Sequence, residues 1–169
     1  MSITMYQASV PQFIRMLGNL KGILQKAAAH AAARKIEESA LLNARLFPDM
    51  FPLTRQVQIA TDFARGTGAR LSGVEPPPVE DREQTFAELV ARVDVAIAYL
   101  HTLPAVKIEG SEAREITRKV RGVERTFAGI DYLLQYSLPN FYFHLATTYA
   151  ILRHNGIEVG KGDFVGSFG

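Results

Sequence analysis

The chain has 169 residues, of which 47% are hydrophobic and 21% charged, a size and balance typical of one globular domain with a sizeable core. Its 19 basic and 17 acidic side chains give a formal net charge of +2, which offers no strong electrostatic argument for nucleic-acid binding. The absence of cysteine excludes disulfides, thiolate catalysis and sulfur-ligated zinc. We therefore expect a single domain over residues 1–169.

Neither an export signal nor a membrane segment is predicted. The N-terminal stretch MSITMYQASVPQF lacks the basic region and following apolar run of a secretory signal. No apolar run approaches the ~20 residues that cross a bilayer. Together with the missing cysteines, these features lead us to expect a soluble, cytoplasmic protein with neither a membrane nor a nucleic acid as partner.

The first predicted element is a long amphipathic helix near the N-terminus. Apolar residues between positions 6 and 31 recur at spacings of three and four, which places them on one helix face. Pro11 predicts that this helix starts near Ser9 or kinks at the proline. Pro48 and Pro52 then predict a non-helical connection, because proline disfavours helix for the residue before it.

Two further helices are predicted on either side of a proline-rich connector. The first covers residues 53–71, with Gln56 beside its apolar stripe. The second opens where Thr85 and Glu88 match the capping-box pattern, and it ends near Thr102. Between the two helices, the segment GVEPPPVED is expected to be stiff and extended.

The segment from residue 106 to residue 132 has sparse apolar residues and charges of both signs. It predicts a short hairpin that turns near Arg121 and Gly122. The densest basic group of the chain lies here and comprises Arg114, Arg118, Lys119, Arg121 and Arg125. Acidic residues dilute this group and no aromatic platform alternates with it, which favours a solvated face over a nucleic-acid surface.

The last predicted helix begins beside Pro139, because proline suits a first helical turn, and it ends at the Asn155–Gly156 pair. The tail after it is expected to dock through apolar side chains, which are Phe164, Val165 and Phe168. Four long amphipathic helices predict an all-α four-helix bundle, with a short irregular or hairpin insertion before the last helix.

Polar side chains interrupt the face of the last helix that should be buried. Two adjoining stripes of this face carry Asn140, Phe141, His144, Thr147 and Thr148. Because an unpaired buried polar group costs about 1–3 kcal/mol, the polar members should be hydrogen-bonded to one another or to water. Gln56 of the second helix is expected to reach the same place.

Two interpretations of these residues stay open. They form either a structural hydrogen-bond network that fixes the helix register, or a ligand or metal pocket in the bundle core. The spacing of four between Asn140 and His144 puts both side chains on one face, as metal binding requires. Asparagine, however, is a poor ligand for zinc or nickel. A site that also uses Asp94 or His101 of the third helix is a further alternative.

Four segments carry a resemblance to a known family. They are MYQASVPQFIRMLGNL, FPLTRQVQIATDFARG, LPNFYFHLATTYAILRHNG and GKGDF. Over nearly the whole chain they resemble an uncharacterised bacterial family of the DinB/YfiT-like superfamily of four-helix bundles. The resemblance implies a bundle that is often dimeric, so a homodimer is expected. It also implies a divalent metal, here nickel or zinc, and in several members a thiol-dependent transferase or isomerase activity.

The resemblance further implies which residues would bind the metal. Enzymes of the superfamily use one histidine of the second helix and two of the fourth, four residues apart. His144 matches the second of the fourth-helix pair, whereas Asn140 stands at the first, and Gln56 or Gln58 at the second-helix position. Two of the three implied ligands are therefore amides, which predicts an incomplete metal site around His144.

The residues and the resemblance leave it open whether the protein is an enzyme. The favoured function is a small-molecule-binding or structural module with a degenerate metal site. Its ligand-binding candidates are Asn140, Gln56, Thr147, Thr148 and Phe141. The alternative is a metal- or thiol-dependent transferase or hydrolase, in which His144 is the general base or the sole imidazole ligand of the metal.

Overall fold

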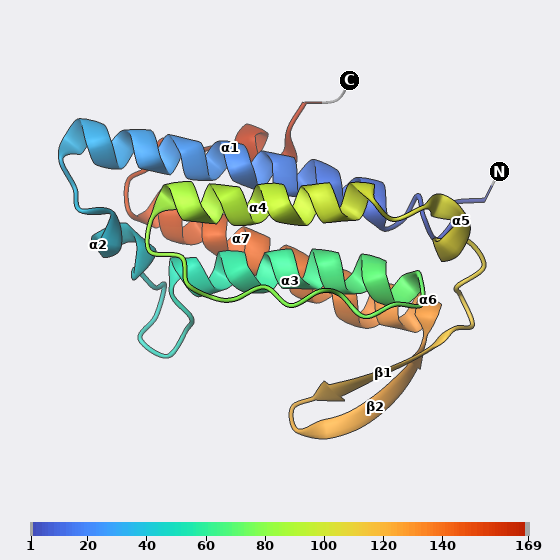
Figure 1. Cartoon of the computed structure of the whole chain (residues 1–169). Helices are drawn as coiled ribbons and strands as arrows, with labels where there is room; N and C mark the ends of the chain where they lie inside the picture. Colours follow the sequence, from blue (N-terminus) through green and yellow to red (C-terminus); the bar gives the residue numbers. More distant parts are fainter. Residues whose placement is uncertain (1, 168–169) are drawn as a thin grey trace.

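Helices dominate the computed structural model, which describes residues 2–167. Its long helices are α1 (Val10–Arg34), α3 (Leu53–Leu71), α4 (Phe86–His101) and α7 (Leu138–His154). Figure 1 shows these four lying side by side. Helix α1 packs against α4, α3 packs against α7, and α3 also packs against α4. The four long helices predicted from the sequence are therefore present.

Shorter elements connect the long helices, and two of them are strands. The helical ones are α2 (Glu38–Leu42), α5 (Ala105–Ile108), α6 (Gly129–Asp131), the π-helical segment η1 (Tyr132–Ser137) and α8 (Lys161–Val165). Strands β1 (Glu115–Val120) and β2 (Val123–Ala128) form a two-stranded antiparallel sheet. The prediction of an all-α fold is therefore correct only in part, since the chain is mostly helical but includes this sheet.

The hairpin turns where the sequence predicted. Arg121 and Gly122 both have positive φ angles, 50° and 82°, which suit a two-residue turn between twisted strands. Ile116 of β1 pairs with Phe127 of β2, and the Ile116 side chain is buried in the core. Figure 1 shows the strands projecting from the helices beside the end of α3.

The helices share one contiguous cluster of buried apolar side chains, which extends from Met5 to Val159. The stripe predicted on α3 lies in this cluster and comprises Leu53, Val57, Ala60, Ala64 and Leu71. Phe13 of α1 meets Phe141 of α7 edge to face, with ring centroids 4.8 Å apart. Phe141 is therefore a core residue that joins the first and last long helices.

Local signals set two of the helix ends as expected. Thr85 Oγ1 accepts a hydrogen bond from the Glu88 backbone N–H at 3.1 Å, and Glu88 returns one to the Thr85 N–H at 3.0 Å. At the other end of the chain, Gly156 adopts a left-handed φ of 86°, and the side chain of Asn155 binds the Ile151 carbonyl. Both the capping box and the Asn-Gly ending are confirmed.

The last long helix begins where the sequence predicted, at Leu138 with Pro139 in its first turn. Helical backbone already precedes it, however, in α6 and η1. Proline has no N–H to donate to the preceding turn, and the wider π-helical turn lies directly before it. The segment η1 carries two tyrosines, Tyr132 and Tyr136, four residues apart, and both line the cavity described below.

The C-terminal tail docks on α1. Phe164 packs edge to face on Tyr149 at 5.9 Å, and the Asn19 side chain donates to the Phe164 carbonyl at 3.0 Å. Arg15 donates to the Val165 carbonyl at 2.7 Å. Phe168, the third residue expected to dock, lies outside the described residues.

The connector between α3 and α4 runs back along α3 (Figure 1) and is held by one arginine. The Arg92 side chain is 2% exposed and pairs with Asp62 of α3 at 2.9 Å, and with Asp81 at 3.0 Å and Glu83 at 2.9 Å of the connector. Its Nε donates to Thr61 at 2.9 Å. These bonds fix the connector to both helices. Within residues 2–167, no helix combines the length and apolar character needed to cross a membrane.

Candidate functional site

His144 and Gln56 meet where α7 packs against α3. The Nδ1 atom of His144 lies 2.7 Å from Oε1 of Gln56, and both side chains are buried. The amide nitrogen of Gln56 in turn donates to the Phe51 carbonyl at 3.1 Å. The structure therefore brings together two of the residues singled out in the sequence, from helices far apart in the chain.

This chain of hydrogen bonds fixes the tautomer of His144. Because the amide nitrogen of Gln56 is used by Phe51, the amide oxygen faces the ring, and Nδ1 must carry the proton. Nε2 then holds the lone pair. It has no hydrogen-bond partner among residues 2–167, yet it is not one of their fully enclosed unpaired atoms. His144 is 9% exposed, so Nε2 reaches the surface.

The surroundings keep His144 neutral. Burial lowers the pKa of His144 from 6.5 to about 4, and the positive charge of Arg55 acts in the same direction. Phe63 stacks on the imidazole with ring centroids 6.2 Å apart, and Phe143 meets it edge to face at 5.3 Å. A neutral imidazole in an apolar setting can accept a hydrogen bond, but it has low proton affinity near pH 7.

The other predicted site residues do not bond to the imidazole. Asn140 is half-buried and donates to the Tyr136 carbonyl at 2.6 Å, and Thr147 donates to the Phe143 carbonyl at 2.7 Å. Thr148 donates to the backbone carbonyl of His144 at 2.9 Å. Each satisfies its polar group on the carbonyl four residues earlier, a bond that short polar side chains often make within a helix.

The alternatives on the remaining helices lie elsewhere. Gln58 is buried but donates to Glu83 at 2.8 Å, on the side of the connector. Asp94 pairs with Lys21 of α1 at 2.7 Å, and half of its side chain is exposed. His101 is also exposed, at the end of α4.

These side chains do not fit the three-ligand metal centre of the superfamily. Among residues 2–167, no three His, Asp or Glu side chains gather as a metal site would need. The Gln56 oxygen is already bonded to His144, and the Asn140 amide to its own helix. Nε2 of His144 is the one imidazole donor that this arrangement offers, too few for zinc or nickel, which are bound by several nitrogen, sulfur or carboxylate ligands.

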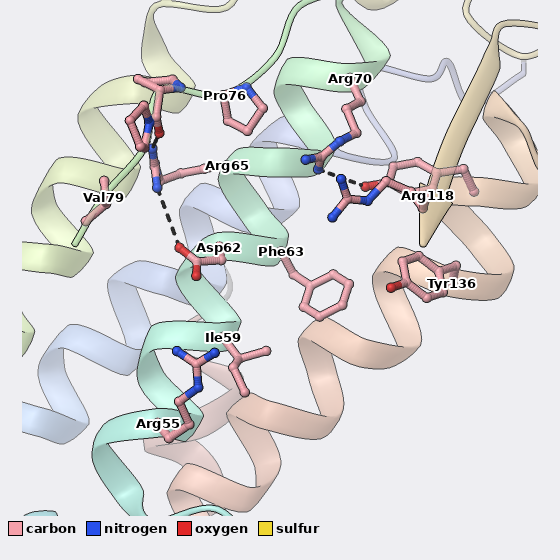
Figure 2. Close-up of a pocket in the computed structure, with 13 residues that line it drawn as sticks. Arg55, Ile59, Asp62, Phe63, Arg65, Arg70, Pro76, Val79, Arg118 and Tyr136 are labelled. Carbon is pink, nitrogen blue, oxygen red and sulfur yellow. Dashed lines mark hydrogen bonds and ion pairs between the residues drawn. The ribbon is translucent and has the colours of Figure 1, made fainter. Parts of the chain in front are cut away.

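A cavity of about 350 Å³ lies next to this pair, over the outer face of α3. Phe63 separates the two, since it stacks on His144 and also lines the cavity. Figure 2 shows α3 as the floor, the connector with Pro76 and Val79 on one side, and Tyr136 with Arg118 on the other. Four segments, which are α3, the connector, β1 and η1, therefore border one space.

The walls of the cavity combine basic and apolar groups. Four arginines line it, Arg55, Arg65, Arg70 and Arg118, against a single carboxylate, that of Asp62. The apolar lining consists of Ile59, Phe63, Tyr132, Tyr136, Val79 and three consecutive prolines, residues 76–78. The lining is about as polar as it is apolar, which is more polar than most small-molecule sites.

Comparison with known proteins identifies the family to which this chain belongs. A family described as a domain of unknown function (DUF1993) matches residues 5–165. The chain belongs to this family. A crystal structure of a DinB family member protein from Shewanella denitrificans is 40% identical, with a TM-score of 0.90. That match covers 96% of this chain and 92% of the other. A search of the curated proteins finds no match.

The resemblance read from the sequence is thereby confirmed: this is a member of an uncharacterised DinB-like family. Membership accounts for the arrangement of the helices. It assigns no role to any side chain, so the function of this DinB-like protein has to be argued from its own residues.

Sequence reasoning missed the cavity of this DinB-like chain. One available signal was the run Arg55, Ile59 and Asp62 on α3, whose spacings of four and three place them on one face outside the core stripe. A second signal was the stiff, proline-rich connector, because such a segment packs against a neighbouring surface. Arg118 was assigned to a solvated basic face, but it is half-buried against the cavity because the hairpin lies beside α3.

Proposed function

We propose that this DinB-like protein is a small-molecule-binding module and that its ligand occupies the cavity over α3. The observation that carries the proposal is the cavity itself, whose volume of about 350 Å³ falls within the range of ligand pockets. Its walls come from packed elements, α3 and η1, and from a connector fixed by Arg92. Such a site is preorganised, which lowers the entropy cost of binding.

In this proposal the His144–Gln56 pair supports the floor of the cavity. The pair joins α7 to α3 by a buried hydrogen bond of 2.7 Å. Phe63 rests on the imidazole and contacts Tyr136 at 5.6 Å on its other side. Loss of the pair would therefore disturb two aromatic side chains of the lining, without His144 touching the ligand.

The alternative is a transferase or hydrolase in which His144 acts directly, by itself or through a metal. The observation that favours it is the unpaired Nε2, whose lone pair reaches the surface of a neutral imidazole. Against it stands the pKa of about 4, because a base with so low a pKa accepts a proton weakly at neutral pH.

A binding screen with one cavity-filling variant tests the proposal. Ile59 lines the cavity, and Ile59→Trp would fill part of it. Val106→Trp is the matched control, since Val106 is 80% exposed on α5. Compounds present at about 100 times their dissociation constant should stabilise the wild type by about 2.7 kcal/mol, seen as a higher melting temperature. The control should respond equally, and Ile59→Trp should not.

Two results would count against this function. If compounds stabilise Ile59→Trp as much as the wild type, they bind outside the cavity. If Ni²⁺ or Zn²⁺ gives the largest stabilisation and His144→Ala removes it, the metal-dependent alternative is favoured instead.

A further inference from the structure

Two arginines whose positive charges have little negative charge near them lie at one end of the cavity. Arg70 comes from the last turn of α3 and Arg118 from β1. Figure 2 shows the two guanidinium groups close to each other. Arg70 also lies within 3.4 Å of the Tyr132 hydroxyl. Like charges repel strongly where water is scarce, so a pair of this kind calls for a negative group between or beside them.

The protein itself supplies little of that negative charge. Within residues 2–167, the Arg118 guanidinium has neither a hydrogen bond nor an ion pair. Arg70 has only long contacts, 3.4 Å to the Tyr132 hydroxyl and 3.4 Å to Glu75, whose side chain is 80% exposed. An ion pair with so exposed a carboxylate is weak.

A buried N–H donor of Arg70 adds to this shortage of negative partners. The Arg70 side chain is 13% exposed, and its Nε is enclosed without a hydrogen-bond partner among the described residues. The lone carboxylate of the cavity, Asp62, is held by Arg92 at 2.9 Å and by Arg65 at 3.6 Å. It therefore neutralises neither Arg70 nor Arg118.

The rest of this end of the cavity is aromatic. The π-helical segment η1 places Tyr132 and Tyr136 on one side, four residues apart. Phe63 of the floor meets Tyr136 edge to face at 5.6 Å, and Phe127 stacks on Tyr136 at 5.5 Å. Aromatic rings that pack on other rings form a rigid apolar surface. Segments of π-helix also occur often at functional sites.

We infer that the cavity binds a small organic anion, with its carboxylate or phosphate group between Arg70 and Arg118 and its flat apolar body against Phe63 and Tyr136. The inference rests on the proposed function and adds the chemical class of the ligand. Guanidinium groups bind both anions through paired N–H donors, so carboxylates and phosphate esters share this chemistry.

Calorimetric titration with simple probes tests the ligand class. The probes are benzoate, phenyl phosphate, inorganic phosphate and the neutral analogue benzyl alcohol. At least one of the two aromatic anions should bind the wild type, and about 10-fold more tightly than benzyl alcohol or inorganic phosphate.

The hairpin provides a matched pair of variants. Arg118→Gln removes the charge at the cavity, whereas Arg125→Gln removes the same charge from the exposed residue that pairs with Arg118 across the sheet. The aromatic anion should bind Arg118→Gln about 10-fold more weakly and Arg125→Gln as tightly as the wild type. Arg118→Lys, which keeps the charge but not the paired donors, should be intermediate. Circular dichroism verifies that each variant is folded.

The possible results separate the two proposals. If benzyl alcohol binds as tightly as the better of the two aromatic anions, or if Arg118→Gln leaves the binding of that anion unaltered, the inference that the ligand is an anion is overturned. If Ile59→Trp still abolishes that binding, the proposed function stands. If inorganic phosphate binds as tightly as phenyl phosphate, the inference that the ligand has an apolar body is overturned. The absence of binding by any probe at millimolar concentration overturns the inference as stated. Binding that Ile59→Trp leaves intact overturns the proposed function as well.

Discussion

The imidazole Nδ1 of His144 lies 2.7 Å from the amide oxygen of Gln56, a residue 88 positions earlier in the chain. Phe51 holds the other end of the same amide at 3.1 Å, so three consecutive groups are fixed by two hydrogen bonds. The consequence is a buried histidine that is neutral and has one defined tautomer.

The first prediction concerns the effect of pH on stability. The folded protein keeps His144 neutral down to a pKa of about 4, whereas the unfolded chain takes up that proton near 6.5. Below pH 6.5 the unfolded state therefore binds more protons, so the free energy of unfolding falls as the pH falls. The loss from this residue should reach about 3 kcal/mol near pH 4 and be absent above about pH 7.

Urea unfolding followed by circular dichroism between about pH 7 and pH 4 measures this effect. His144→Gln keeps a polar side chain beside Gln56 but has no proton to gain. Its stability should depend less steeply on pH than that of the wild type. Parallel curves for the two proteins would show that His144 is not the group responsible.

The second prediction concerns the charge beside the imidazole. Gln56→Glu places a carboxylate next to Nδ1 and should raise the pKa of His144 by roughly one to three pH units, because an opposite charge at this distance favours the protonated ring. Titration of the histidine signals by NMR measures the change. Gln25→Glu, on an exposed position of α1, is the control and should leave His144 unaltered. A pKa that stays near 4 in Gln56→Glu would mean that the pair does not form in solution.

The third prediction concerns the arginine that fixes the connector. Arg92→Met removes the cation between Asp62, Asp81 and Glu83 and leaves three neighbouring carboxylates without their shared partner. The free energy of unfolding should fall by about 3 kcal/mol, since removing one member of a buried ion pair is costly. Limited proteolysis should cut the connector faster than in the wild type.

The neighbouring Arg82 provides the comparison for this variant. Its side chain is 80% exposed and pairs with Glu80 in solvent, so Arg82→Met should alter stability by only a few tenths of a kcal/mol. Equal effects of the two variants would argue that Arg92 does not hold the connector.

The fourth prediction concerns the cap of α4. Thr85→Ala removes the hydroxyl that accepts the Glu88 N–H at 3.1 Å and should cost about 1 kcal/mol, or roughly 2–4 °C in melting temperature for a chain of this size. Thr85→Ser keeps the hydroxyl and should melt close to the wild type. A loss as large in the serine variant would point to the threonine methyl group instead of the cap.

The features that could be predicted from the sequence are those decided by neighbours along the chain. Thr85 and Glu88 cap a helix through atoms three residues apart, and Arg121 with Gly122 turns a hairpin through two backbone angles. The apolar stripes of the long helices and the family resemblance belong to the same class. Such patterns depend on residues that are close together in the sequence, so they can be predicted from it.

Both parts of the candidate site, the His144–Gln56 pair and the cavity, depended on tertiary packing. Sharing a helix face with His144 suggested that Asn140 and Thr147 would bond to it, but each found the carbonyl four residues earlier on its own helix. Gln56 reached the imidazole because α3 packs against α7. The cavity needed α3, the connector, the hairpin and η1 to converge, and no local pattern predicts how close these segments come. The sequence by itself determined the helices, their caps, the hairpin and the family. Only the packing of those elements decided that His144 would be neutral and that Arg70 and Arg118 would share one space.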